Sequence, residues 1–287
     1  MYRCAALIYH AGGFCFGSIT DIQSAQISYL TSHGFVVVKP QYRLVPQIHA
    51  AQAFLECEDA CVWAKTVLPS IMADDHGLQV DIGKVVAMGY SSGGTLALHL
   101  ASLRLVKAVT AVGPAVFLAD TSTEAHHATS ELPFGSMPNF VPSEAEWEGI
   151  KPAGVQLCGA PVRMPGPGVV LGPREKWVGN TFKHGQWAAT LAPDGDYSRI
   201  APKTRLHRDW PPVTIIHGGE DRVPGRSVEL IRRAEREMKD VEIDVQAVIV
   251  ANAGHLFDHN PAMGTTELGE KWKAVVQGLE WLEKHLE

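Results

Sequence analysis

The sequence lacks the features that would assign it to a membrane or to nucleic acid. None of its 287 residues belongs to an apolar run approaching the roughly 18 residues of a membrane span. It has no stripe of Lys or Arg, and its formal net charge is −6. The mixed run "RRAERE" at residues 232–237 is typical of a solvated helix face. We therefore expect no membrane span and no nucleic-acid partner.

Cysteine is scarce, and its spacing does not indicate a disulfide framework. The count is five, an odd number, and no Cys-x-x-Cys occurs. Cys57 and Cys61 are four residues apart in a helical pattern, so they share one face. The N-terminal "MYRCAALIYHAGG" reaches glycine quickly, which favours a strand over a signal peptide. We expect reduced thiols in a cytoplasmic protein.

Short apolar runs rich in β-branched residues alternate with longer helical patterns. The strand candidates are residues 4–9, 35–39, 84–88, 106–112, 213–217 and 241–250, and the helix candidates are 18–32, 50–68, 93–103, 225–239 and 268–286. This alternation predicts an α/β fold with a mostly parallel sheet flanked by helices. With 46% hydrophobic residues, the chain can build one large core.

One region interrupts this alternation. From about residue 117 to 208 no clear strand–helix unit occurs, and proline and glycine crowd residues 152–173. Trp147, Trp177 and Trp187 argue against a disordered linker. We predict a lid, or cap, of short helices and loops at 117–208, inserted into a core formed by 1–116 and 209–287.

The stretch "MGYSSGGTLAL", residues 88–98, has the pattern of a nucleophile elbow. Gly89-x-Ser91-x-Gly93 follows an apolar strand and precedes a helix with leucines along one face. The turn is so sharp that it requires glycine two residues before and two residues after the serine. Ser92 is a poorer candidate, because Tyr90 would then stand where glycine is needed. The alternative to a nucleophile elbow is a purely structural glycine-rich turn in which serine caps the helix.

A serine nucleophile needs a histidine base, which in turn needs an acid to fix its tautomer. After such an elbow, the acid and then the base follow along the chain. The loop "HGGEDRVPG" after a late strand offers Asp221 as the acid, with Glu220 as the fallback. Either carboxylate could instead cap the next helix. "ANAGHLFDHN", after the last strand, offers His255 as the base, whereas His259 is expected to be structural.

The anion site is predicted early in the chain. "LIYHAGGFCFGS" ends a strand and enters a turn at Gly12 and Gly13. Acyl transfer places negative charge on the former carbonyl oxygen, and rigidly held backbone N–H groups stabilise that charge. We expect the amides of Gly12, Gly13 and Ser92 to form this oxyanion hole. His10 is expected to hold the loop in shape by hydrogen bonding.

Taken together, these segments resemble the α/β-hydrolase superfamily, and specifically the hormone-sensitive-lipase-like carboxylesterases. "HAGGF" is similar to the family's His-Gly-Gly-Gly loop, "YRLVP" to its Tyr-Arg-Leu-Ala-Pro segment and "GYSSGG" to its elbow. "HGGEDRVP" and "AGHLFD" are similar to its acid and base loops. The resemblance covers nearly the whole chain except the lid, and it implies the α/β-hydrolase fold.

The sequence also departs from that family. Ala11 replaces a glycine, Tyr90 stands where aspartate is usual, and "HGGED" is equally similar to dienelactone-hydrolase and peptidase relatives. The family's two earlier strands have no counterpart here, which leaves about six strands and is compatible with a short start or a truncated gene model. The strand at 35–39 would then lie near a sheet edge, so we expect a loop or another chain, in a homodimer, to cover it.

The resemblance implies a serine hydrolase that cleaves a carboxylic ester, lactone or thioester of a largely apolar small molecule. The acyl-enzyme would form on Ser91, no metal or organic cofactor is implied, and a polyketide-like ester of secondary metabolism would fit. A non-catalytic small-molecule binding protein is one alternative, because fold does not fix function. An acyltransferase or cyclase is another, since lid geometry and water access choose the acceptor.

Overall fold

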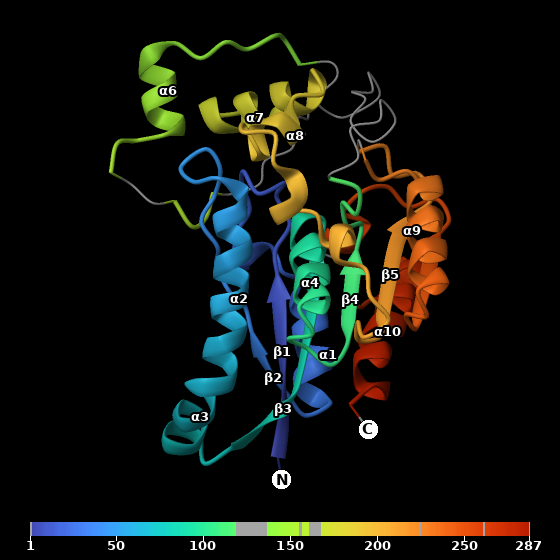
Figure 1. The fold of residues 1–287 in the computed structure, drawn as a ribbon. Coiled ribbons are helices and arrows are strands. Elements are labelled where there is room, and N and C mark those ends of the chain that lie inside the picture. Colours follow the sequence, from blue (N-terminus) through green and yellow to red (C-terminus); the bar gives the residue numbers. More distant parts are fainter. Residues whose placement is uncertain are drawn as a thin grey trace.

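A parallel sheet forms the centre of the molecule (Figure 1). The computed structural model describes residues 2–118, 137–154, 157–160, 168–223, 225–260 and 262–286. Its sheet has six strands in the order β2-β1-β3-β4-β5-β6, each parallel to its neighbour. The strands are β1 (Tyr2–Tyr9), β2 (Phe35–Val38), β3 (Gln79–Tyr90), β4 (Val109–Val112), β5 (Val213–Gly218) and β6 (Val245–Val250). The predicted α/β fold is confirmed, and β2 lies at an edge as expected.

Helices cover both faces of the sheet, because the strands are apolar on both sides. One face carries α2 (Ala50–Thr66), α4 (Ser92–Ser102) and α9 (Val228–Asp240), whose buried side chains form one core with the sheet. The opposite face carries α1 (Ser24–Ser32) and α10 (Gly269–Lys284), which enclose a second core. Every residue of β5 is buried, as a strand covered on both faces requires.

Several elements have other bounds than those predicted from the sequence. The helix expected at 50–68 divides into α2 and α3 (Leu68–His76), because Pro69 occupies the start of a second helix that ends at left-handed Gly77. The segment 18–32 divides into a short 3₁₀ turn, η1 (Ile19–Asp21), and α1. The strands expected from 106 and 241 begin later, at Val109 and Val245.

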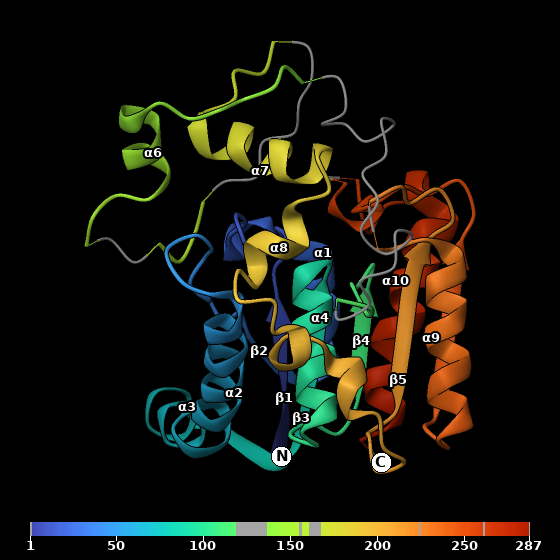
Figure 2. The ribbon, with the colours of Figure 1, turned by 45° about the horizontal axis from the view of Figure 1, so that its top comes forward.

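Short helices follow β4 and precede β5 in the chain. They are α6 (Glu144–Ile150), α7 (Pro173–Lys183), α8 (Trp187–Leu191), η2 (Tyr197–Arg199) and η3 (Pro202–Arg205). Figures 1 and 2 show α6, α7 and α8 gathered beyond the end of the sheet to which β1 points. Parts of the predicted lid, residues 119–136, 155–156 and 161–167, lie outside the described residues. The division into core and lid stays a prediction.

Arg174, near the start of α7, connects α6 and α7 to the loops that follow β1 and β2. Its buried guanidinium donates hydrogen bonds to the carbonyl oxygens of Cys15 (2.5 Å), Val45 (3.0 Å) and Ile150 (2.7 Å), and to Oε1 of Gln47 (2.5 Å). A buried guanidinium is costly unless its donors are satisfied, and here four acceptors receive them. Arg174 therefore fixes α7 directly over the loop that follows β1.

All five cysteines lie in the described part of the chain, and none forms a disulfide bond. Within that part, no helix combines the length and the apolar character needed to cross a membrane. The homodimer predicted to cover the edge strand stays a prediction. Because all strands are parallel, the loops that follow β1, β3, β4, β5 and β6 gather at one end of the sheet.

Candidate active site

Ser91 lies in the sharp turn between β3 and α4. Its backbone has φ 53° and ψ −116°, a conformation that few residues with a side chain adopt. A β-carbon on Gly89 would lie 2.1 Å from the carbonyl oxygen of Gly93, and one on Gly93 would lie 2.2 Å from that of Tyr9. Both positions therefore require glycine, for the steric reason expected from the sequence.

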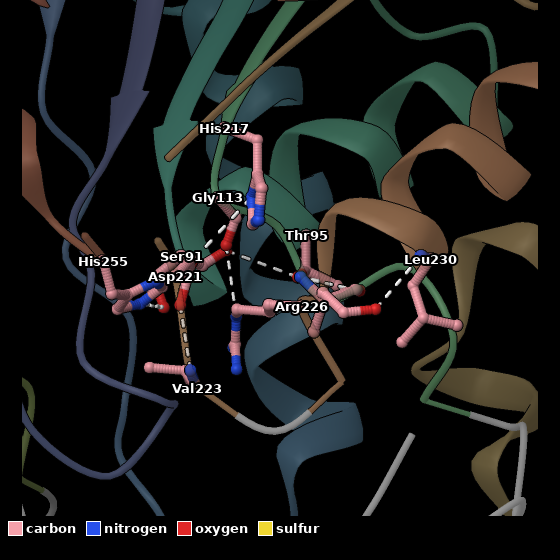
Figure 3. Close-up of polar contacts among 11 residues, drawn as sticks. Ser91, Thr95, Gly113, His217, Asp221, Val223, Arg226, Leu230 and His255 are labelled. Carbon is pink, nitrogen blue, oxygen red and sulfur yellow. Dashed lines mark hydrogen bonds and ion pairs between the residues drawn. The ribbon is translucent and has the colours of Figure 1, made fainter. Parts of the chain in front are cut away.

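Three polar side chains form a continuous series at this turn (Figure 3). His255 Nε2 lies 3.0 Å from Ser91 Oγ, and His255 Nδ1 lies 2.6 Å from Asp221 Oδ2. An ionised carboxylate only accepts hydrogen bonds, so Nδ1 carries the proton and Nε2 presents its lone pair to the serine hydroxyl. The structure thus brings together the three side chains that were singled out in the sequence as nucleophile, acid and base.

The environment of Asp221 suits an ionised carboxylate, although the side chain is almost completely buried. Its second oxygen accepts a hydrogen bond of 2.9 Å from the amide of Val223. Burial raises the pKa of Asp221, but the electrostatic attraction and hydrogen bond of His255, the attraction of His217 and the hydrogen bond from Val223 together outweigh it, so the pKa lies below its ordinary value. Glu220 is exposed to solvent, and the carboxylate that pairs with His255 among the described residues is that of Asp221.

In the loop after β1, hydrogen bonds to the carbonyl oxygens fix the orientation of the peptide groups. Gly12 and Gly13 have φ values of 133° and 58°, which glycine adopts without strain. The carbonyl of Gly12 accepts hydrogen bonds from the amides of Cys15 (2.9 Å) and Phe16 (3.0 Å). Because a peptide group is planar, this fixes the direction of the Gly13 N–H. The amides of Gly12 and Gly13 take part in no hydrogen bond among the described residues.

Ser92 supplies the third predicted amide. It is the first residue of α4, and the first N–H groups of a helix have no partner within the helix. Its peptide N–H also lies at the positive end of the helix dipole, which favours a developing negative charge. The side chain of Ser92 points away from this role, since its Oγ lies 3.3 Å from the hydroxyl of Tyr42.

His10 holds the loop, as expected from the sequence. Its Nδ1 donates a 2.7 Å hydrogen bond to the carbonyl of Ala11, which fixes the direction of the Gly12 N–H. Its imidazole stacks on the ring of Tyr42, with centroids 4.3 Å apart. Burial lowers the pKa of His10 to about 4, so the ring is neutral near pH 7. A neutral ring makes this bond only when its proton is on Nδ1.

Two buried groups beside the acid had not been singled out in the sequence. The guanidinium of Arg226, which precedes α9, donates a 3.1 Å hydrogen bond from Nε to the carbonyl of Gly113. Gly113 follows β4 and packs on the base: a β-carbon there would lie 3.3 Å from Cε1 of His255. Nothing in the sequence indicated that Arg226 supports the Gly113 carbonyl, because a charged residue before a helix normally lies at the surface. Its burial in the structure is what points to this contact.

His217, the fifth residue of β5, lies on the other side of the acid. Its Nδ1 is 3.8 Å from Asp221 Oδ2, too far for a hydrogen bond. Burial lowers the pKa of His217 to about 4, against the opposing charge of Asp221. A neutral His217 leaves the charge of Asp221 available to His255. In the described part of the chain, His, Cys, Asp and Glu side chains form no group of three suited to a metal ion.

The family described as "alpha/beta hydrolase fold" matches residues 6–138. A non-reducing polyketide synthase of Penicillium brasilianum is 27% identical over 327 residues, an alignment covering 99% of this chain and 13% of the synthase. The chain therefore corresponds to a small part of that protein.

Two solved esterase structures share the fold. A thermophilic esterase from Thermogutta terrifontis has a TM-score of 0.59 at 18% identity, covering 99% of this chain and 82% of that one. An esterase from Pyrobaculum calidifontis has a TM-score of 0.61 at 20% identity, and the match covers 97% of this chain and 77% of the esterase. At these identities the likeness concerns the fold alone. The chain has the α/β-hydrolase fold, and over residues 6–138 it is similar to the family described by that name.

Proposed function

We propose that this protein is a serine hydrolase that cleaves a carboxylic ester or thioester of a largely apolar small molecule through an acyl-enzyme. The observation that carries the proposal is the hydrogen-bonded series Ser91–His255–Asp221 at a strained strand–helix turn. A serine hydroxyl is a weak nucleophile near neutral pH, and this arrangement is the one that activates it. The amides of Gly12, Gly13 and Ser92 would stabilise the charge that develops on the substrate oxygen.

The first half of the reaction forms the acyl-enzyme. Ser91 Oγ attacks the carbonyl carbon of the substrate while its proton moves to His255 Nε2. The carbonyl electron pair moves onto oxygen and gives a tetrahedral oxyanion. When the intermediate collapses, the bond to the leaving alcohol or thiol breaks, and the leaving group receives the proton from His255. Asp221 holds the imidazole in the required tautomer and stabilises its transient positive charge.

The second half releases the acid. Water attacks the acyl carbon and gives a proton to His255 Nε2, forming a second tetrahedral oxyanion at the same amides. The bond to Ser91 Oγ then breaks, and His255 returns the proton to that oxygen. These steps need no group beyond the residues named.

The comparisons and the aromatic side chains beside the site both bear on the acyl group of the substrate. The relative from Penicillium brasilianum is named as a polyketide synthase, which supports a polyketide-like acyl group of secondary metabolism. Aromatic side chains of α7 and α8, Phe182 and Trp187, are buried beside Gly13 and favour apolar groups there. We therefore expect aryl and medium-chain acyl esters and thioesters to be hydrolysed in preference to charged ones.

A fluorophosphonate probe tests the proposal directly. It should label the wild type on Ser91, as located by mass spectrometry, and fail to label Ser91→Ala and His255→Ala variants that retain the wild-type circular dichroism. Hydrolysis of nitrophenyl esters and simple acyl thioesters should show the same dependence. Labelling at another residue, or turnover by Ser91→Ala, would reject the assignment. A folded wild type that neither reacts nor hydrolyses would favour the binding-protein alternative.

A further inference from the structure

Trp187, the first residue of α8, contacts the loop after β1 although the two lie far apart in the chain. Its indole Nε1 donates a 2.9 Å hydrogen bond to the carbonyl of Gly13, and its side chain is buried. One neighbour of the indole is Phe182, whose ring stacks with centroids 5.3 Å apart and planes 18° apart. A second is Arg226, whose Cζ lies 5.0 Å from the ring centroid. The indole is therefore fixed from several sides.

The hydrogen bond from Trp187 completes the fixing of three successive peptide groups. His10 holds the carbonyl of Ala11, and amides within the turn hold that of Gly12. The next carbonyl, that of Gly13, is held by the inserted segment instead. Gly13 has φ 58° and no side chain, so its backbone has more freedom to rotate than any other residue type would have. The ψ angle of Gly13 sets the direction of its carbonyl, and the indole of Trp187 holds that carbonyl by its hydrogen bond.

We propose that Trp187 is a positioning residue: by holding the Gly13 carbonyl it fixes the Gly13–Phe14 peptide group and so restrains rotation at Gly13, whose own N–H is one of the expected oxyanion donors. The inference rests on the proposed function, in which those amides stabilise the tetrahedral intermediate. Misdirected donors cannot contribute in a transition state that needs them within hydrogen-bond distance of the oxyanion. Trp187 itself need not touch the substrate, since it acts through the backbone of Gly13.

Arg226 extends this link to the other half of the site. Its guanidinium lies against the indole of Trp187 and also donates to the carbonyl of Gly113, which packs on His255. A cation over an indole face is attracted by the ring, and more strongly so when both are buried. The anion loop and the base loop are thus joined through one residue of the insertion. A displacement of α8 would affect both at once.

The substitution Trp187→Phe separates the hydrogen bond from the packing, because phenylalanine keeps an aromatic ring but has no N–H. We expect kcat for ester hydrolysis to fall about tenfold with KM changed less than about twofold, a smaller loss than when an oxyanion donor itself is removed. Trp177→Phe is the matched control, since the indole of Trp177 makes no hydrogen bond among the described residues and lies edge-on to Trp147. It should leave kcat within about twofold of the wild type.

Hydrogen–deuterium exchange supplies a second readout that does not depend on activity. In Trp187→Phe, peptides covering residues 10–16 should exchange faster than in the wild type, whereas peptides of β5 should not change. An unchanged kcat together with unchanged exchange in the loop would overturn the proposal. Loss of stability without a change in the loop would show that Trp187 has only a packing role. If the wild type hydrolyses no ester, the proposed function fails, but the exchange measurement still decides whether Trp187 holds Gly13.

Discussion

The hydroxyl of Tyr42 lies 2.9 Å from the carbonyl oxygen of His10, and the two rings are stacked within 10° of parallel. The same hydroxyl lies 3.3 Å from Ser92 Oγ. Tyr42 therefore ties the end of β1 to the first residue of α4. The loop that would bind the oxyanion and the turn that carries Ser91 are held together by one buried phenol.

Removing that hydroxyl should weaken both the fold and the reaction. Tyr42→Phe leaves the ring in place but deprives a buried carbonyl of its donor, which costs about 1–3 kcal/mol of unfolding free energy. Urea denaturation measures this cost. Ester hydrolysis should fall as well, because the loop and the elbow lose their direct connection. Tyr29→Phe is the matched control, since Tyr29 lies on α1 outside the site, and equal effects in the two variants would contradict the special role of Tyr42.

The identity of the acid can be tested by comparing two neighbouring carboxylates. Asp221→Asn replaces the acceptor for His255 Nδ1 with an amide that favours the wrong tautomer, so kcat should fall on the order of 10⁴-fold. Glu220→Gln changes an exposed side chain and should leave kcat within about twofold. Steady-state kinetics of both variants provide the measurement. A large loss in Glu220→Gln with a small loss in Asp221→Asn would move the acid to Glu220.

The sequence was most informative where covalent geometry restricts the residue type. Gly89 and Gly93 are needed because the backbone approaches within contact distance of any β-carbon there, and this requirement is visible as a motif. The strands were recognisable because burial on both faces demands continuous apolar residues, as in β5. Chain order then singled out Asp221 and His255 among many carboxylates and histidines.

The remaining contacts depend on tertiary packing that no local pattern encodes. Arg226 was not predicted, because its burial results from the approach of α8 and β4 from distant parts of the chain. The same holds for the hydrogen bond of Trp187 to Gly13, which joins residues 174 positions apart. The helix α3 was not predicted, since the expected helix ended at Leu68; Pro69 occupies the first turn of α3, where its missing N–H costs nothing.

The strained backbone at Ser91 predicts a difference between two inactive variants. Both Ser91→Ala and Ser91→Gly remove the nucleophile, but only glycine adopts φ 53° and ψ −116° without steric cost. Relief of that strain is worth about 1–3 kcal/mol, reduced by the larger entropy of glycine in the unfolded chain. We expect Ser91→Gly to unfold at a higher temperature than Ser91→Ala in differential scanning calorimetry. The reverse order would show that the turn is not strained in solution.

Two buried histidines predict an acid-sensitive fold. Burial lowers the pKa of His10 and of His217 to about 4, from an ordinary value near 6.5. Between these pH values the unfolded chain binds protons that the native protein does not, so the unfolding free energy must fall as pH decreases from 6.5 to 4. The contribution of each histidine is on the order of 3 kcal/mol across that window.

Denaturant titrations from pH 7.5 to pH 4.5 would measure this dependence. His217→Gln should reduce the slope of unfolding free energy against pH by about 1.4 kcal/mol per pH unit near pH 5, because one proton fewer is taken up on unfolding. His76→Gln, at an exposed position of α3, should leave the slope unchanged. A slope that is the same in the wild type and in His217→Gln would mean that His217 is charged in the folded protein.

Arg174 determines how firmly α7 is held over the loop that follows β1. Replacing it with methionine keeps the apolar stem but removes the donors to Cys15, Val45 and Ile150. Since hydrogen bonds from a charged group are worth about 1.5–3 kcal/mol each and the buried carbonyls would lose their partner, α7 should detach before the sheet unfolds. Limited proteolysis should then cleave within residues 137–186 of Arg174→Met while the sheet domain resists. Arg199→Met, at an exposed arginine of η2, is the control, and equal resistance of Arg174→Met and wild type would show that other contacts hold α7 in place.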